Sequence, residues 1–492
     1  MTERLLISQS SLLWRTAVWS KDRLLEYREE PRGQYPVVGS IYRGRVHRIL
    51  DSLSALSVDY GGSSLGFLPL DEISSESFSA LGASAGIPTS FKKGQEVLVQ
   101  IQRPARGSKG ARLTSKFSLP GRYWVFLPCA APEILVSKKL GDREFRTRIR
   151  EMFTPLLEGS GGLVLRSVAT LDSMDELEKE LQTLRARWTE IQNQGPSLKT
   201  GEAAYHDLQL PYRALREQVS KDCSEIVVDD ISLLDSIKES IQGRYGSLCG
   251  MMRLATGTQP LFDEYPVDSH LARATQRKVL LPSGGSLVFD ETEAMVVVDV
   301  NAGRPDEKDA PYFRTNMEAA AELGVQLRLR DMTGIIVVDF INMKGSRDRR
   351  RIEDAVRDSL RMDPVKTQVY GMTELYLLQI VRSGGRRQSY SRSQESCLLC
   401  NGRGSLPSFE SEGLRALHQS ERLLMRKDVS GVELFAAEAL LESLSSALSG
   451  AMEILREKYQ KRIVLSAGPD YHSREYRIRA MHEIEPPQTT GK

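Results

Sequence analysis

The sequence has few cysteines and no long apolar segment, and each shortage excludes a class of protein. Five cysteines among 492 residues are too few for the disulfide framework of small secreted domains. No run approaches the roughly 20 apolar residues that a membrane-spanning helix needs. The amino terminus lacks the basic region and apolar core of a secretory signal. We therefore expect a cytoplasmic protein without a membrane span.

The chain also lacks an excess of charge of either sign. Its 67 lysine and arginine residues nearly balance 65 aspartate and glutamate residues, which gives a formal net charge of +2. This excludes a histone-like protein whose overall charge drives nucleic-acid binding, but it allows local basic surfaces. With 40% hydrophobic and 27% charged residues, the composition is that of a globular protein, and the length predicts about three or four domains.

Residues 38–117 contain five short apolar stretches separated by Gly-, Ser- and Pro-rich loops, which is typical of a small closed β-barrel. Between residues 41 and 120, ten basic residues oppose six acidic ones, and Tyr42, Tyr60 and Phe67 lie among them. Basic grooves lined with aromatic side chains hold single-stranded nucleic acid in OB-type barrels. The alternative is that these aromatic side chains only fill the core of the barrel.

Two apolar runs later in the chain each end in an aspartate. Residues 295–298 precede Asp299, residues 335–338 precede Asp339, and a helical pattern separates them. This order predicts a β-α-β unit with parallel strands. If the strands are neighbours, both carboxylates lie at the same edge of the sheet, where ligands bind in open α/β folds. Asn301 is two residues after Asp299 and therefore faces the same side.

Two adjacent carboxylates in a half-buried site repel each other unless one is protonated or a cation bridges them. With oxygen ligands alone, the suitable cation is Mg²⁺ or Mn²⁺, and Mg²⁺ keeps waters that can attack a phosphodiester. The alternative is that each aspartate only caps the turn or helix that follows its strand. The pattern alone favours neither interpretation.

Cys397 and Cys400 form a C-x-x-C pair followed by a glycine-rich turn. Structural zinc takes four ligands, but no cysteine follows, and the next histidine, His418, lies at no usual zinc-finger spacing. One chain thus supplies half of a zinc site, and a second copy can supply the other half. A redox pair and an unmetallated turn are the alternatives, although the thioredoxin-like unit that usually carries a redox pair is absent.

Together, and in this order, these motifs resemble the bacterial ribonuclease E/G family. The resemblance covers nearly the whole chain and is strongest in residues 281–301, in residues 326–341, and at the C-x-x-C pair with residues 401–404. It implies a Mg²⁺-dependent endoribonuclease that cuts single-stranded, AU-rich RNA and leaves 5′-phosphate products, in ribosomal RNA maturation and messenger RNA decay. The competing hypothesis is a non-catalytic RNA-binding module that recruits partners.

The resemblance also implies a multidomain mixed α/β (α+β) fold. A ribonuclease-H-like domain would be split by an inserted OB-type RNA-binding barrel and a 5′-sensor. A DNase-I-like catalytic subdomain, a zinc link and a small C-terminal domain would follow. The expected boundaries are 1–37 and 212–277 for the ribonuclease-H-like parts, 38–117 for the barrel, 118–211 for the sensor, 278–394 for the catalytic subdomain, 395–405 for the zinc link and 406–492 for the small domain.

Carried onto this sequence, the resemblance assigns catalysis to Asp299, Asp339 and Asn301, with the two aspartates binding Mg²⁺ or Mn²⁺. It assigns Zn²⁺ shared between two protomers to Cys397 and Cys400, which implies a homodimer or a dimer of dimers. The remaining assignments are RNA binding by Tyr42, Phe67, Lys109 and Arg112, and 5′-monophosphate sensing by Arg166 and Ser167.

The sequence departs from the family pattern in ways that bear on RNA binding. We expect Ser57, in place of an aromatic residue, to weaken base stacking, and Glu374, in place of an arginine, to remove one RNA contact. The chain ends without the long scaffold tail of some members and so resembles the ribonuclease G branch. The other departures are Ser167 for threonine, which keeps the hydroxyl of the sensor, Asn342 for aspartate, and Leu398 for proline.

Overall fold

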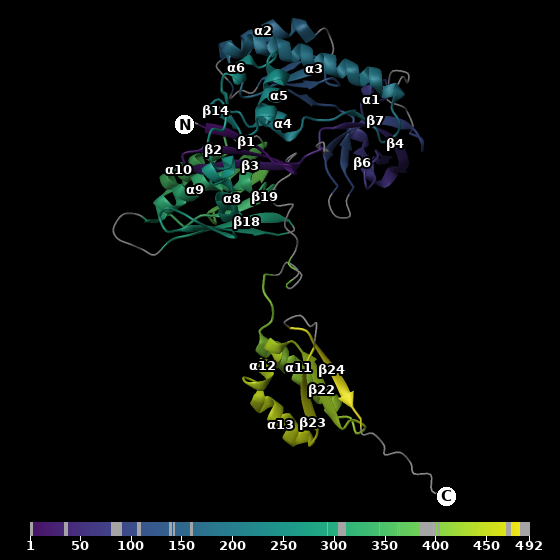
Figure 1. Ribbon diagram of the computed structural model, residues 1–492, viewed down its shortest axis with the longest axis vertical. Coiled ribbons are helices and arrows are strands. Elements are labelled where there is room, and N and C mark those ends of the chain that lie inside the picture. Colours follow the sequence, from purple (N-terminus) through teal and green to yellow (C-terminus); the bar gives the residue numbers. More distant parts are fainter. Residues whose placement is uncertain are drawn as a thin grey trace. The chain divides into compact units, whose positions relative to one another are not determined.

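In the computed structural model the chain forms two compact units, Met1–Ser393 and Gln394–Lys492 (Figure 1). Within the described part of the chain, no helix combines the length and the hydropathy that crossing a membrane requires. The structure describes residues 3–33, 38–79, 91–105, 110–136, 140, 143–157, 161–292, 294–303, 311–343, 345–361, 363, 365–383, 397, 400, 404–468 and 474–482.

The first sheet joins two parts of the chain that are far apart in sequence. Its strands are β1 (Glu3–Gln9), β2 (Leu13–Ser20), β3 (Arg23–Pro31), β14 (Cys223–Val228) and β15 (Met252–Leu254). They follow the order β15-β14-β1-β2-β3, in which β1 is parallel to β14 and antiparallel to β2. Because alternate side chains of a strand point to opposite faces, Leu5 and Ile7 pack with one set of helices and Leu6 with another. The helices are α4 (Leu210–Glu217), α5 (Ile231–Ile241) and α6 (Gly246–Cys249) on one face, and α7 (Leu261–Glu264) and α8 (Val267–Ala274) on the other.

The second sheet closes into a barrel. Its strands are β4 (Ile41–Leu50), β5 (Ala55–Asp59), β6 (Gly66–Pro69), β7 (Glu96–Arg103) and β8 (Arg112–Thr114). They follow the order β4-β5-β6-β8-β7, and β7 pairs back with β4. The five-stranded barrel predicted for residues 38–117 is therefore confirmed. Two short elements adjoin it, α1 (Glu76–Ser79) beside β7 and β13 (Ala203–Tyr205), which pairs with β4.

The third sheet packs against one long helix. Its strands are β9 (Leu119–Pro120), β10 (Trp124–Leu127), β11 (Ile134–Val136) and β12 (Gly162–Leu165), in the order β11-β12-β10-β9. The helices are α2 (Arg143–Phe153) and α3 (Met174–Gln194). Trp124 and Trp188 lie in the core between these elements.

The fourth sheet carries the two aspartates. Its strands are β16 (Lys278–Leu280), β17 (Ser286–Glu291), β18 (Met295–Asn301), β19 (Gly334–Asp339), β20 (Thr367–Met372) and β21 (Leu377–Arg382), in the order β16-β17-β18-β19-β21-β20. The strands β18 and β19 are parallel and are joined through α9 (Pro311–Leu329), so the predicted β-α-β unit is confirmed. Both α9 and α10 (Ser346–Ser359) pack on one face of this sheet. The opposite side of α9, with Val325 and Leu329, packs against the first sheet.

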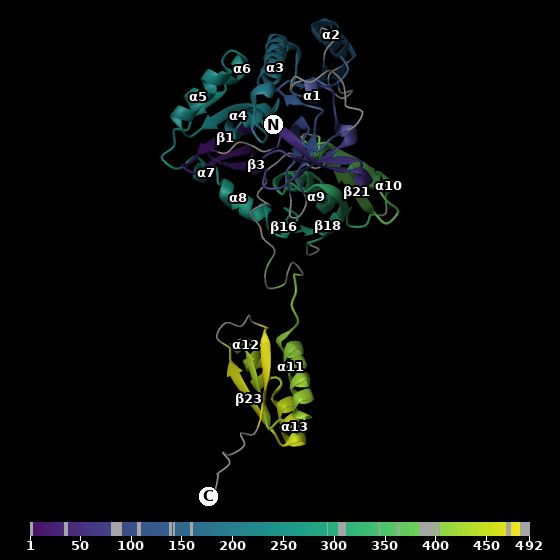
Figure 2. The ribbon, with the colours of Figure 1, turned by 90° about the vertical axis from the view of Figure 1, so that its right-hand side faces the viewer.

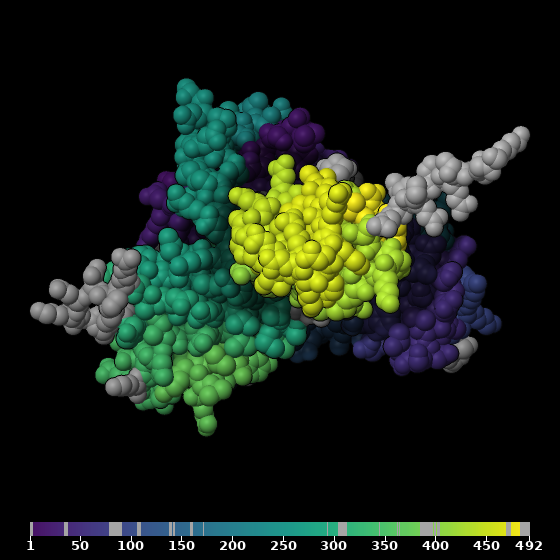
Figure 3. All heavy atoms as spheres, turned by 90° about the horizontal axis from the view of Figure 1, so that it is seen from below, coloured from purple at the N-terminus to yellow at the C-terminus, as the bar shows by residue number. Residues whose placement is uncertain are grey.

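The second unit is a three-stranded sheet with helices on one face (Figure 2). Its elements are α11 (Phe409–Leu424), β22 (Gly431–Ala436), α12 (Glu438–Ser445), α13 (Ser449–Tyr459), β23 (Arg462–Ala467) and β24 (Tyr476–Met481). The central strand β22 is parallel to β23 and antiparallel to β24. In the space-filling view the atoms of this unit form one rounded body, drawn in yellow and yellow-green (Figure 3).

Candidate functional site

Asp299 and Asp339 lie side by side at the carboxyl ends of adjacent parallel strands. The register of β18 and β19 places Asp299 opposite Asp339, and neighbouring strands are about 4.8 Å apart. Val298 and Val338, one residue earlier on each strand, are fully buried beneath the helices. The two carboxylates therefore project from the other face of the sheet. They lie together at its edge, as the aspartate at the end of each apolar run predicts.

The site is more open than the sequence indicates. Asp299, Asn301 and Asp339 are all exposed, so the expectation of a half-buried site is wrong. The reason is that α9 and α10 cover only the opposite face of this sheet. Because water screens the repulsion between exposed carboxylates, that repulsion alone is no argument for a bound cation.

The donor atoms of this site nevertheless suit a hard cation. The amide Nδ2 of Asn301 donates a hydrogen bond to Oδ2 of Asp299 at 2.8 Å. Among the described residues, no group of three or more His, Cys, Asp and Glu side chains is arranged to hold a metal ion. Mg²⁺ does not require such a cage, because one or two carboxylates commonly hold it while water and substrate phosphate complete the shell. The pair Asp299 and Asp339 fits that mode of binding.

Two segments next to the carboxylates are fixed by buried contacts. Asn316 of α9 is fully buried; its Nδ2 donates to the carbonyl of Ile341 at 2.8 Å, and its Oδ1 accepts from the N–H of Ile341 at 3.1 Å. Ile341 is two residues after Asp339. At Gly285, a Cβ atom would lie 2.7 Å from the carbonyl oxygen of Asn301, so only glycine fits there. The role of Asn316 was not predicted from the sequence, where its one signal is a polar residue on an apolar helix face.

A guanidinium group lies near the same edge of the sheet. Leu377 pairs with Asp339 across β21 and β19, and the preceding residue, Tyr376, packs under Arg349 of α10, 5.1 Å from guanidinium carbon to ring centroid. The Nε of Arg349 is buried without a hydrogen-bond partner. Glu374 is exposed in the same turn. The positive charge of Arg349 therefore lies close to Glu374, the position at which this sequence lacks the arginine of the family pattern.

On the barrel, one cross-strand row combines basic and aromatic side chains. Ser57 is paired with Arg48 on one side and with Phe67 on the other, and Phe67 is paired with Arg112. Their neighbours along the strands, including Leu68, point into the barrel core. The row therefore faces outward, and it brings together two of the predicted RNA-binding residues, Phe67 and Arg112.

The other barrel residues behave differently. Tyr60 is buried in the barrel core, and Tyr42 packs against that core and against Tyr60 at 6.0 Å between ring centroids. Tyr60 therefore fills the barrel core, and Tyr42 is partly buried against that core. Arg43 donates to the carbonyls of residues 195, 196 and 198 and is paired with Glu96, so this arginine joins the barrel to the next segment. Lys109 lies outside the described residues.

The predicted sensor residues directly follow β12. The Nη1 of Arg166 donates to the carbonyl of Gly121 at 2.9 Å, and its side chain is partly buried. Burial lowers the pKa of Arg166, and the nearby charge of Arg216 adds to that effect while the Glu217 carboxylate opposes it. Ser167 is exposed. The hydroxyl of Ser167 is thus accessible, and the role of both residues in phosphate sensing stays a prediction.

None of the five cysteines, all of which lie in the described part of the chain, forms a disulfide bond. Cys397 is exposed and Cys400 is partly buried, while most of the expected zinc link, including Leu398, lies outside the described residues. The zinc site therefore stays a prediction.

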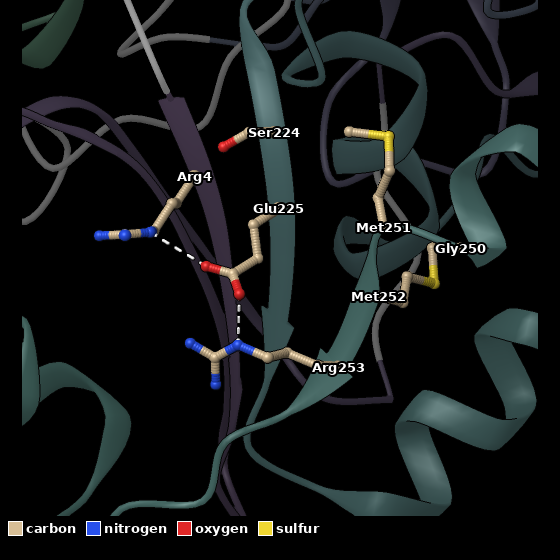
Figure 4. A pocket seen from close by; sticks show the side chains of 7 residues that line it. All are labelled: Arg4, Ser224, Glu225, Gly250, Met251, Met252 and Arg253. Atoms are coloured by element: carbon tan, nitrogen blue, oxygen red, sulfur yellow. Dashed lines mark hydrogen bonds and ion pairs between the residues drawn. The ribbon is translucent and has the colours of Figure 1, made fainter.

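An open groove of about 460 Å³ lies at the edge of the first sheet (Figure 4). Glu225 accepts a hydrogen bond from Arg4 at 3.0 Å and another from Arg253, so the charges at its centre are paired with one another. None of the predicted site residues lines it; the lining residues are Arg4, Ser224, Glu225, Gly250, Met251, Met252 and Arg253.

Comparisons with known proteins agree on one family. The sequence model of the Ribonuclease E/G family matches residues 118–384. The chain is similar to ribonuclease G of Salmonella typhimurium (strain SL1344), with 30% identity over 97% of this chain and 99% of that protein. It is 34% identical to ribonuclease E of Escherichia coli (strain K12) over 85% of this chain and 40% of that protein. It is 31% identical to ribonuclease E of Haemophilus influenzae over 96% of this chain and 51% of that protein.

Proposed function

Because this chain belongs to the ribonuclease E/G family and is an RNA-processing endoribonuclease, we propose that it hydrolyses single-stranded, AU-rich RNA with Mg²⁺. Its products carry a 5′-phosphate, and its substrates are ribosomal RNA precursors and messenger RNA. Mn²⁺ replaces Mg²⁺ where it is available, because both ions prefer oxygen ligands. A Zn²⁺ ion held by Cys397 and Cys400 of two protomers links the active dimer.

The observation that carries the proposal is the register of Asp299 with Asp339. The two carboxylates would hold Mg²⁺, which supplies positive charge to the scissile phosphate and lowers the pKa of a bound water. Asn301 fixes the orientation of Asp299 through their hydrogen bond, and its amide contacts the phosphate or the attacking water. Arg349 adds positive charge that attracts the RNA backbone at this edge.

The barrel row of Arg48, Ser57, Phe67 and Arg112 supports single-stranded RNA as the substrate. The two arginines pair with phosphates, and Phe67 offers a face on which an unpaired base can stack. A base inside a duplex has no free face for such stacking. This row therefore selects unpaired RNA.

The test is cleavage of a 5′-monophosphorylated, AU-rich single-stranded oligoribonucleotide in Mg²⁺ and in chelator. Asp299→Asn and Asp339→Asn should each lower the rate by at least about 10²–10³ while RNA binding in chelator is retained. Asp290→Asn is the matched control, because Asp290 is exposed on β17 and paired with Arg277. Full activity of either site variant, or wild-type activity in chelator, would contradict the proposal. RNA binding without cleavage by the wild type would favour the RNA-binding module.

A further inference from the structure

A buried carboxylate of α3 holds the turn that connects β9 to β10. Glu180, whose side chain is only 1% exposed, accepts hydrogen bonds from three successive backbone N–H groups, those of Arg122, Tyr123 and Trp124. Successive N–H groups that converge on one point form an anion-binding nest. In this turn a side chain of the protein itself fills the nest.

A hydroxyl group from another part of the chain completes the partners of this carboxylate. Tyr245, directly before α6, donates its phenolic O–H to Oε1 of Glu180. Each oxygen of Glu180 then accepts two hydrogen bonds, which is its full capacity. Burial and the neighbouring Glu180 charge raise the pKa of Tyr245, so the phenol keeps the proton that it donates. The ring of Tyr245 packs against the hydrophobic cores of both the first and the third sheet.

The same turn supports the predicted sensor arginine. The Nη1 group of Arg166 donates to the carbonyl of Gly121 at 2.9 Å, and the backbone N–H of Arg166 donates to the carbonyl of Tyr123 at 2.8 Å. Among the described residues, the Arg166 guanidinium has no other hydrogen-bond partner. Its orientation therefore depends on where the turn places the carbonyl of Gly121, and its remaining N–H groups are available to a phosphate.

Glycine at position 121 fits this arrangement because of Glu180. A Cβ atom on Gly121 would lie 2.3 to 2.6 Å from the carboxyl atoms of Glu180, and the carboxylate cannot move aside without losing hydrogen bonds. Burial lowers the pKa of Arg166, and the carboxylates of Glu217 and Glu180 oppose that effect. Glu180 thus fixes the backbone beneath Arg166 and also favours the charged form that binds a phosphate.

We propose that Glu180 and Tyr245 are positioning residues for recognition of the RNA 5′-end. They hold residues 121–124 so that the carbonyl of Gly121 directs the Arg166 guanidinium toward the terminal phosphate. Neither residue touches the RNA, and both act through Arg166. The inference rests on the proposed function for its RNA substrate and on Arg166 as the group that binds the 5′-monophosphate.

Binding of two oligoribonucleotides of one sequence to the full chain, in chelator, tests the proposal. One carries a 5′-monophosphate and the other a 5′-hydroxyl, and the wild type should bind the monophosphate more tightly. Glu180→Gln replaces one accepting oxygen with an amide donor and should reduce this preference about three- to tenfold, because it displaces a charge-assisted contact. Tyr245→Phe removes only the hydroxyl and should reduce the preference by a smaller factor. Glu178→Gln, at an exposed position of the same helix, is the matched control.

Gly121→Ala tests the same contact from the side of the turn. The added methyl group would collide with the Glu180 carboxylate, so this variant should lose about as much of the preference as Glu180→Gln. The double variant should lose no more than either single variant, because both substitutions disrupt one contact. Additive losses would show that the two residues act separately and would contradict the proposal.

The preference for the monophosphate separates positioning from a structural role. A merely structural role of Glu180 would weaken binding of both oligoribonucleotides by the same factor, and that result would overturn the inference. Equal affinity of the wild type for the two would overturn it as well. If Glu180→Gln fails to fold, as judged by thermal melting, an unchanged preference in Tyr245→Phe would overturn it.

The assay in chelator is independent of cleavage, so this inference and the nuclease can fail separately. Reduced preference in the variants, together with no cleavage by the wild type in Mg²⁺, would support the inference and contradict the nuclease. Cleavage by the wild type, together with an unchanged preference in the variants, would leave the nuclease intact and overturn the inference.

Discussion

Asn316 holds the peptide backbone of Ile341 through both of its polar groups, at 2.8 Å to the carbonyl and 3.1 Å from the N–H. The contact joins the middle of α9 to the segment that leaves β19 just after Asp339. Since α9 also packs against the first sheet, the position of the Asp339 carboxylate depends on how the first and fourth sheets pack against this helix.

Loss of this contact should slow cleavage without weakening RNA binding. We expect Asn316→Ala to lower kcat about tenfold or more, because small displacements of a catalytic group carry large costs in rate. Asn316→Asp, which can still accept from the N–H of Ile341 but sets a buried carboxylate oxygen against its carbonyl, should be impaired at least as much. Single-turnover cleavage and the Kd in chelator measure the two effects, with Asn193→Ala on the exposed side of α3 as control. An unchanged kcat would show that the contact does not position the site. So would a weakening of RNA binding by the same factor as the fall in kcat.

An aromatic residue at position 57 should increase RNA affinity. Ser57 lies between Arg48 and Phe67 in the outward row of the barrel, so Ser57→Phe adds a stacking face between a basic and an aromatic neighbour. We expect single-strand affinity to rise about fivefold or more, as one additional stacked base should provide. Fluorescence anisotropy with a short oligoribonucleotide measures the gain, and Tyr60→Phe, inside the core, is the control. Equal affinity of the wild type and Ser57→Phe would argue against RNA contact along this row.

The chain should cut 5′-monophosphorylated RNA faster than 5′-triphosphorylated RNA. A monophosphate fits a compact set of charge-assisted donors, which a triphosphate overfills. Ser167→Ala should reduce this preference without disturbing the fold, because the Ser167 side chain is exposed. Arg166→Lys should reduce it further, since Arg166 combines a positive charge with its hydrogen bond to Gly121. Rate ratios on the two substrates are the measurement, and equal rates for the wild type would mean that these residues do not sense the 5′-end.

Removal of either thiol of the C-x-x-C pair should release zinc and dissociate the dimer. Each substitution removes one thiol from each protomer and leaves the dimer with two of the four zinc ligands. Two ligands cannot hold structural zinc, so Cys397→Ser and Cys400→Ser should have the same effect. Metal analysis and light scattering report zinc content and mass, and cleavage should fall with the mass. Cys249→Ser, at a cysteine far from the pair in sequence, is the control. A wild-type chain that contains no zinc, or a variant of unchanged mass, would contradict the link.

Acid should destabilise the first sheet through Glu217. Although burial opposes ionisation, Arg216 and Arg28 outweigh it and hold the pKa of Glu217 well below its usual value. A carboxylate with a depressed folded-state pKa adds stability above its unfolded pKa of about 4.3, and that stability is lost as the pH falls through the folded value. Glu217→Gln should cost about 1–3 kcal/mol at pH 7, and the difference from wild type should shrink below about pH 4. Hydrogen exchange of β2 and β3 measures the free energy of opening, and a difference that does not change with pH would exclude this role.

Local patterns in the sequence were sufficient to predict the barrel, the β-α-β unit and the positions of the carboxylates. Alternating and continuous apolar runs determine which stretches form strands, and a crossover helix makes two strands parallel, so Asp299 and Asp339 had to meet if their strands were neighbours. The spacing of Asn301 from Asp299 follows from the two-residue repeat of a strand, and the hydrogen bond between them agrees with it.

Only the tertiary structure decided what surrounds those residues. Exposure of the carboxylates depends on which face α9 and α10 cover, and strand periodicity does not specify that face. The contacts of Asn316 with Ile341, of Arg349 with Tyr376 and of Glu180 with Tyr245 join residues that no local spacing relates. The chemical identity of the site residues was therefore readable from the sequence, whereas their accessibility and their partners depend on long-range packing.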